Sequence, residues 1–194
     1  MREVSPEEIM DLTGYEKIRE DFVRRMIELK RPRRVQVGDE LCFVFENRDT
    51  VIFQIQEMTR AERIVKEEAI AAEVDVYNEL VPGPDELSAT LMIEIPDMKA
   101  IRPALDRLVG IDEHVWLDVG GELVRASFDD KQFEEDRIAA VQYVRFPLGP
   151  ELAARFRDPE VPVSLRVDHP NLSAETPITG ATRASLAADL AADA

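Results

Sequence analysis

The pattern of apolar and polar residues predicts a helix near the N-terminus. Two capping-box patterns, at residues 5–8 and 13–16, mark helix starts. After the second, apolar side chains recur at helical spacing until Pro32 stops the run: Tyr15, Ile18, Phe22, Met26 and Leu29. We therefore expect an amphipathic helix that ends before Pro32.

The next segments read as a hairpin followed by helices. Residues 35–37 and 41–45 are rich in strand formers and flank Gly38, which predicts a hairpin. Beyond it, two interpretations stay open. Asp49 could cap a helix that bears Val51 and Ile55, or residues 51–56 could form a returning strand. We favour the helix, because residues 56–73 are rich in helix formers, and expect a second helix to about Leu80.

The second half of the chain alternates between strand and helix patterns. We expect a strand at 89–95, a helix from Asp97 to Gly110, a hairpin over 115–126 and a charged loop at 129–137. Strands follow near 140–146 and 161–167, separated by a short helix from Pro150. Hairpins without regular βαβ alternation predict an α+β fold, a mainly antiparallel sheet with three to four packed helices. Residues 1–180 would form one domain, and 181–194 an Ala-rich tail with a weak helix.

The composition excludes several kinds of site and several classes of protein. The 194 residues include one cysteine, Cys42, so neither an intramolecular disulfide nor an all-cysteine metal site can form within one chain. No apolar run approaches the length that spans a bilayer, and the first residues lack the apolar core of a secretory signal. We expect a cytoplasmic protein without membrane insertion. Within the apolar run at 41–45, the Cys42 thiol would behave as a small hydrophobe.

The charge is strongly negative and uneven. The formal net charge is −16, but residues 1–36 hold nine Lys/Arg against eight Asp/Glu, which leaves −17 for the remainder. Such a balance argues against general nucleic-acid binding, which depends on cations at the phosphates. A local basic cluster is formed by Arg24, Arg25, Lys30, Arg31, Arg33 and Arg34. It fits either a helix C-terminus or a docking patch for an acidic partner or a second copy.

The strongest site signal is the polar segment after residue 46. Amides and charges stand there beside Phe and Ile, and buried polar groups need partners. Three interpretations remain: internal ion pairs and a turn closed by Asn47 and Asp49; a recognition surface of planar donors; or an active site built on carboxylates such as Glu46, Glu57, Glu62 and Glu94. The candidate ligand- or partner-binding residues are Asn47, Arg48, Asp49, Gln54, Gln56, Glu57, Arg60 and Glu62.

The two histidines offer a weaker candidate. His114 and His169 could join Asp168 in a two-histidine, one-carboxylate metal site if the fold brings them together. Each could equally be a turn or packing residue. The sequence has no nucleophile elbow, dinucleotide fingerprint or phosphate loop.

Several strings resemble the bacterial DUF3501 family. They are FENRDTV (45–51), QIQEM (54–58), RAERI (60–64), ATLMIE (89–94) and HVWL (114–117), and the similarity extends to DHP at 168–170. The family has no assigned function. Its members tend to be encoded beside iron–sulfur oxidoreductases and rubrerythrin-like proteins, which implies a redox setting. One cysteine cannot hold a cluster, so a redox centre would belong to the partner.

These observations lead to two hypotheses. The first is a non-catalytic accessory protein, without a cofactor of its own, that docks onto such a redox enzyme or self-associates. The second is a small metal-binding protein or enzyme that uses His114, His169 and nearby carboxylates.

Overall fold

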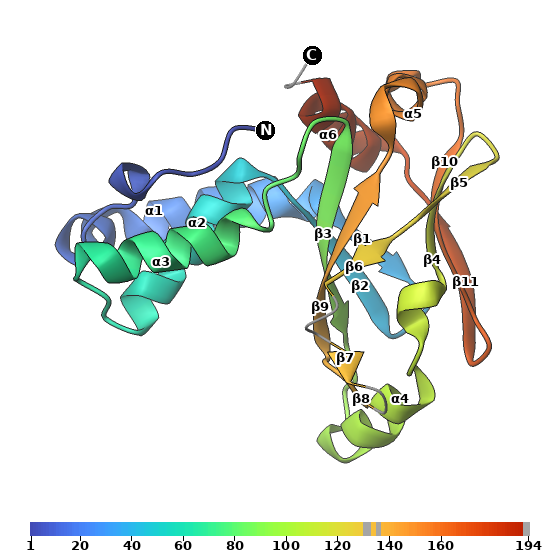
Figure 1. The fold of residues 1–194 in the computed structure, drawn as a ribbon, viewed down its shortest axis with the longest axis horizontal. Coiled ribbons are helices and arrows are strands. Elements are labelled where there is room, and N and C mark those ends of the chain that lie inside the picture. The colour runs from blue at the N-terminus through green and yellow to red at the C-terminus, as the bar shows by residue number, and fades with distance from the viewer. Residues whose placement is uncertain (130–132, 135–136, 192–194) are drawn as a thin grey trace.

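The computed structural model describes residues 1–129, 133–134 and 137–191. It consists of a body of two packed β-sheets and an arm of three helices that extends from one side of the body (Figure 1). The fold is α+β and its sheets are antiparallel, which confirms the predicted class. None of the helices in the described ranges is long and apolar enough to cross a membrane.

The body contains a five-stranded and a four-stranded sheet. The first has the order β1 (Arg34–Val37), β2 (Leu41–Glu46), β3 (Glu86–Ile93), β9 (Val141–Pro147) and β6 (Ser127–Phe128). The second has the order β11 (Leu172–Pro177), β10 (Val163–His169), β4 (Val115–Val119) and β5 (Glu122–Arg125). A two-stranded sheet pairs β7 (Phe133–Glu134) with β8 (Arg137–Ile138), within the predicted charged loop, part of which lies outside the described residues.

The two large sheets enclose the main core because alternate side chains of each strand point inward. Phe43 and Phe45 of β2 and Leu165 of β10 are fully buried between them. Residue Ala126 joins β5 to β6, so the chain crosses from one sheet to the other there. On the opposite side the Thr176 hydroxyl donates to the Gln36 carbonyl at 2.6 Å, which links β11 to β1. Both sides of the sandwich are thereby closed.

The arm is built from α1 (Leu12–Lys30), α2 (Arg48–Ala61) and α3 (Glu67–Asn78), with a short 3-10 helix η1 (Pro6–Glu8) beside them. The helix prediction for residues after 49 is confirmed, and the alternative strand at 51–56 is wrong. Two predicted caps are also wrong. Asp11, rather than Thr13, caps α1, and Asn47, rather than Asp49, caps α2 by accepting from the Thr50 N–H at 3.0 Å.

Three shorter helices complete the body. They are α4 (Ile101–Arg107), flanked by 3-10 turns η3 (Met98–Ala100) and η4 (Ile111–Glu113), then α5 (Gly149–Arg157) and α6 (Gly180–Ala191). The predicted tail helix is α6, and it is firmly packed: Leu186 and Leu190 are buried in the main core. Strands β6 and β11 were not expected from the sequence. The 3-10 turn η2 (Arg31–Arg33) links α1 to β1.

Candidate functional site

Four of the eight predicted polar residues make contacts within the arm. Gln56 is fully buried on α2 and holds Met10 by two hydrogen bonds, from Nε2 to the Met10 carbonyl at 2.9 Å and from the Met10 N–H to Oε1 at 3.0 Å. Arg48 at the start of α2 forms an ion pair with Glu8. These contacts fix the N-terminal segment to α2, as the internal-pairing interpretation predicted for Arg48.

Glu57 is the centre of a second network that joins α1 to α2. Its carboxylate accepts from Arg19 Nε at 2.8 Å and Nη2 at 2.7 Å, and from the Tyr15 hydroxyl at 2.6 Å. The Arg19 guanidinium lowers the pKa of Glu57, against an opposing effect of burial. Burial and the Glu57 hydrogen bond raise the pKa of Tyr15. Arg60 adds an ion pair to Glu16 of α1, with Nε 2.6 Å from Oε1.

The remaining candidates divide between capping and exposed positions. Asn47 caps α2 and donates to Asp189 Oδ1 of α6 at 3.4 Å, so the predicted turn closed by Asn47 and Asp49 is wrong. Asp49 and Glu62 are exposed, and Gln54 is partly buried. Half of the predicted set therefore braces the arm, and of the eight residues only Glu62 lines the groove described below.

The basic cluster contains one residue with a buried role. Arg33 is 1% exposed; it donates to the carbonyls of Phe45 at 2.8 Å and Glu46 at 3.0 Å and pairs with Asp189 of α6. It thus connects the arm, the sheet and the C-terminal helix. The other basic residues lie near the end of α1 and at the start of β1, in local ion pairs or over aromatic rings: Arg24, Arg25, Lys30, Arg31 and Arg34.

The structure brings the metal candidates together on the body. His114 Nδ1 lies 3.1 Å from Asp168 Oδ1, and the rings of His114 and His169 are edge to face at 5.2 Å. The indole N–H of Trp116 also donates to Asp168 Oδ1 at 3.0 Å. This bond and the one from His114 lower the pKa of Asp168.

His169 has both ring nitrogens occupied. Nδ1 accepts from the Asn171 N–H at 3.2 Å, so Nε2 carries the proton and donates it to the Val109 carbonyl at 3.0 Å. Within the described ranges, no group of three or more His, Cys, Asp or Glu side chains is arranged to hold a metal ion. Hydrogen bonds thus hold Nδ1 of His114, just before β4, and both ring nitrogens of His169, at the end of β10.

Cys42 is buried on β2, as predicted. Burial raises the pKa of its thiol, although Arg34, whose Nε lies 2.9 Å from Sγ, has the opposite effect. Such a thiol is a weak nucleophile at neutral pH.

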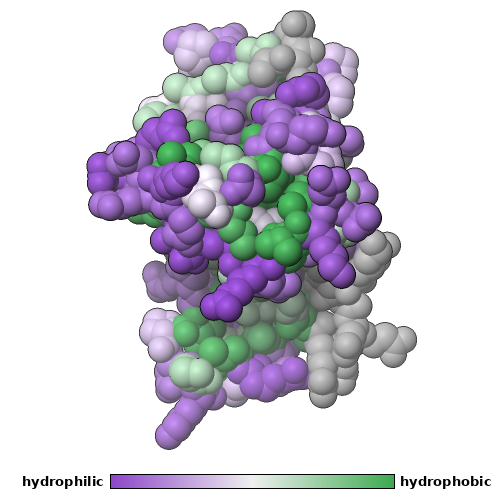
Figure 2. All heavy atoms as spheres, turned by 90° about the vertical axis from the view of Figure 1, so that its left-hand side faces the viewer, coloured by the Kyte–Doolittle hydropathy of each residue, from purple (hydrophilic) through white to green (hydrophobic). Residues whose placement is uncertain are grey.

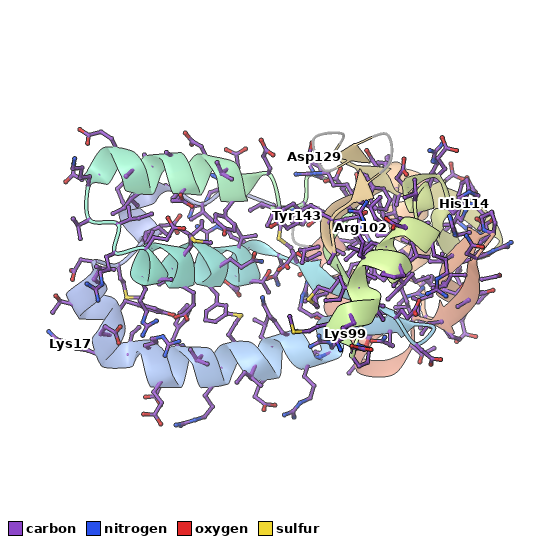
Figure 3. The ribbon with its side chains drawn as sticks, turned by 90° about the horizontal axis from the view of Figure 1, so that it is seen from below. Lys17, Lys99, Arg102, His114, Asp129 and Tyr143 are labelled. Atoms are coloured by element: carbon purple, nitrogen blue, oxygen red, sulfur yellow. The ribbon has the colours of Figure 1, made fainter. Side chains whose placement is uncertain are left out.

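A groove that the sequence did not predict lies where the arm meets the five-stranded sheet. We call it the arm–sheet groove; its volume is about 660 Å³. Figure 3 places Tyr143 at this junction and His114 at the far end of the body. The lining of the arm–sheet groove combines residues in or next to α2 and α3 with residues in or next to β3, β6 and β9. They are Met58, Glu62, Glu73, Val76, Tyr77, Glu79, Leu80, Ser88, Ser127, Phe128, Asp129, Tyr143, Val144 and Arg145. No local motif links such distant segments, so only the fold reveals them.

The groove is acidic at its rim and apolar within. Among the described residues that line it, four are carboxylates and one is a cation, Arg145, which forms an ion pair with Glu86. Burial raises the pKa of Tyr77 and of Tyr143, and the charge of Glu46 adds to the effect on Tyr143. Val76 on α3 is 63% exposed. Figure 2 shows hydrophobic side chains framed by hydrophilic ones on the arm side of the molecule.

Comparisons with known proteins identify a family and one similar structure. The sequence matches DUF3501, described as a protein of unknown function, over residues 3–190. The fold is similar to a crystal structure of a novel protein of unknown function from Burkholderia pseudomallei K96243. The TM-score is 0.91 and the identity 36%, over 97% of this chain and 100% of the other. No curated protein matches the sequence. The chain belongs to the DUF3501 family.

Proposed function

We propose that this chain is a non-catalytic accessory protein that binds a partner protein in the arm–sheet groove. The observation that carries the proposal is the lining of the groove, in which the exposed Val76 and partly buried aromatic side chains stand beside four carboxylates. Exposed apolar surface with a polar rim is typical of sites of protein association. The internal pairing of Arg48, Gln56 and Glu57 supports moving the predicted docking surface from α2 to the groove.

The proposed partner is a redox enzyme of the iron–sulfur or rubrerythrin-like type. This part of the proposal rests on the gene neighbourhood that the family resemblance implies. Cys42 is the only cysteine and is buried, so the metal centre of such a pair would be the partner's. The acidic rim would favour a basic surface on that enzyme and would speed their association at low salt.

A capture experiment in the native host tests the docking site. Tagged parent protein should co-purify a partner, and Val76→Arg should lose it because the change places a long cation among the apolar side chains of the groove. Ile27→Arg is the matched control: Ile27 is 58% exposed on α1, outside the groove. Equal recovery of the partner by Val76→Arg and Ile27→Arg would contradict the proposal.

The histidine cluster supports one alternative, a metal-binding protein or enzyme. Its supporting observation is the His114–Asp168 contact at 3.1 Å beside His169. Elemental analysis of untagged protein tests it. Stoichiometric metal that is lost in both His114→Ala and His169→Ala would favour this alternative over docking.

A further inference from the structure

Beneath the lining of the arm–sheet groove, on the same face of the five-stranded sheet, lies a buried carboxylate with an unsatisfied oxygen. Glu46 ends β2 and is 2% exposed. Its Oε1 accepts from the Thr90 hydroxyl at 2.7 Å, whereas Oε2 is buried without a hydrogen-bond partner among the described residues. An unpaired buried carboxylate oxygen is costly, and such groups mark sites where a partner group is to be supplied.

The sheet register places this oxygen behind the groove. Glu46 is opposite Ser88, Ser88 is opposite Arg145, and Thr90 is opposite Tyr143. Residues paired in this way share one face of a sheet. Ser88, Tyr143 and Arg145 line the groove, so Glu46 lies on the face that forms its floor. The influence of Glu46 on the pKa of Tyr143 agrees with this proximity.

We infer that Glu46 is the counter-ion for a lysine side chain of the docked partner. The four carboxylates of the rim attract a cation, and the apolar lining at Met58, Tyr77 and Leu80 suits a lysine's methylene stem. An arginine is the weaker fit, because in bidentate pairing Oε1 would have to accept from the guanidinium as well as from Thr90. A lysine ammonium is a compact charge that can pair with the single free oxygen. This inference rests on the proposed docking function and specifies its ligand.

Titration with small amines tests the inference. ¹⁵N-labelled protein is titrated with n-butylammonium chloride, which mimics a lysine side chain, and its amide shifts are followed at constant ionic strength. Saturable shifts at residues 46, 88 and 143 are expected. Glu46→Gln should weaken binding by about tenfold or more, because it removes the charge but keeps the shape. Glu68→Gln, an exposed position on α3 outside the groove, removes the same charge and should leave the titration unchanged.

Two further ligands test whether the site selects an ammonium group. 1-Butanol should give no saturable shifts at these positions, and n-butylguanidinium should bind more weakly than n-butylammonium. Equal affinity of the parent and Glu46→Gln for n-butylammonium would overturn the inference, as would equal shifts with 1-butanol. Failure of this titration while Val76→Arg still loses the partner would reject the lysine and leave docking intact. If the titration succeeds but Val76→Arg still captures the partner, docking in the groove would be rejected.

Discussion

The arm and the sandwich are stabilised in different ways. The sandwich is closed around a large apolar core, in which Phe43, Phe45, Phe146 and Leu165 are fully buried. The arm has a small apolar core around Val51, Ile55 and Val74. Its helices are held by Gln56, Glu57 and Arg48 as well, through hydrogen bonds and ion pairs. The comparison shows how a dense polar segment can serve packing, while the junction keeps the exposed apolar side chain of Val76 that the docking proposal uses.

The largest expected effect is in the sandwich. Phe45→Ala should lower the free energy of unfolding by about 3–5 kcal/mol, because it leaves a cavity in a fully buried cluster. Its ring lies 6.1 Å from that of Phe146. Urea unfolding followed by circular dichroism measures the change. A loss below about 1 kcal/mol would mean that the sheets repack freely and that the apolar core is less well defined than described.

A smaller loss is expected from the polar brace of the arm. Gln56→Leu keeps the size of the side chain but leaves the Met10 N–H and carbonyl without these partners. We expect a loss of about 1–3 kcal/mol by urea unfolding. Gln54→Leu, a partly buried position on the same helix, is the control and should cost less. Equal effects of the two changes would contradict a special role for Gln56.

Acid should weaken the arm before the sandwich. Arg48 lowers the pKa of Glu8 from 4.5 to about 2, and Arg19 lowers that of Glu57. A carboxylate with a depressed folded-state pKa stabilises the fold above its unfolded pKa, and this contribution is lost as the pH falls through the folded-state value. Between pH 4.5 and 2 the protection factors of amide exchange, which correct for the intrinsic rate at each pH, should therefore fall more in α1 and α2 than in β3 and β10. A uniform fall in protection would contradict the distinction between the two regions.

The smallest effect is expected at an exposed ion pair. Arg24 contacts Glu20 and Asp21 on α1, and both partners are largely exposed. Surface pairs of this kind contribute little, so Arg24→Ala should change the free energy of unfolding by less than about 0.5 kcal/mol. A larger loss by urea unfolding would show that the basic end of α1 supports the arm through contacts other than this pair.

The sequence predicted regular elements more successfully than their contacts. Alternation at Ala89, Leu91 and Ile93 identified β3, because one face of that strand is buried. Strand β11 was not predicted because Ser173, Ala174 and Pro177 are poor strand formers. The strand is stabilised by its pairing with β10. Arg33 looked like one of several surface cations, and only the fold shows that Asp189 lies beside it.

The candidate site was harder to predict because it lies where the helical arm meets the five-stranded sheet. The expectation of partners is met at Arg48, Gln56 and Glu57, but those partners come from α1 and the N-terminal segment, and the partner of the cap residue Asn47 comes from α6. The groove combines α3 with β6 and β9. About fifty residues separate the end of α3 from β6, and β9 lies further along the chain. Neither the periodicity of apolar residues nor the spacing of motifs predicts that these elements lie together, since both describe residues that are neighbours along the chain.

Site-specific photo-crosslinking in the native host tests the docking account most directly. A photoreactive residue at position 76 lies in the arm–sheet groove, and one at position 27 lies on α1 outside it. The account predicts a discrete crosslinked partner from position 76 and none from position 27. A partner captured from position 27 alone would contradict it.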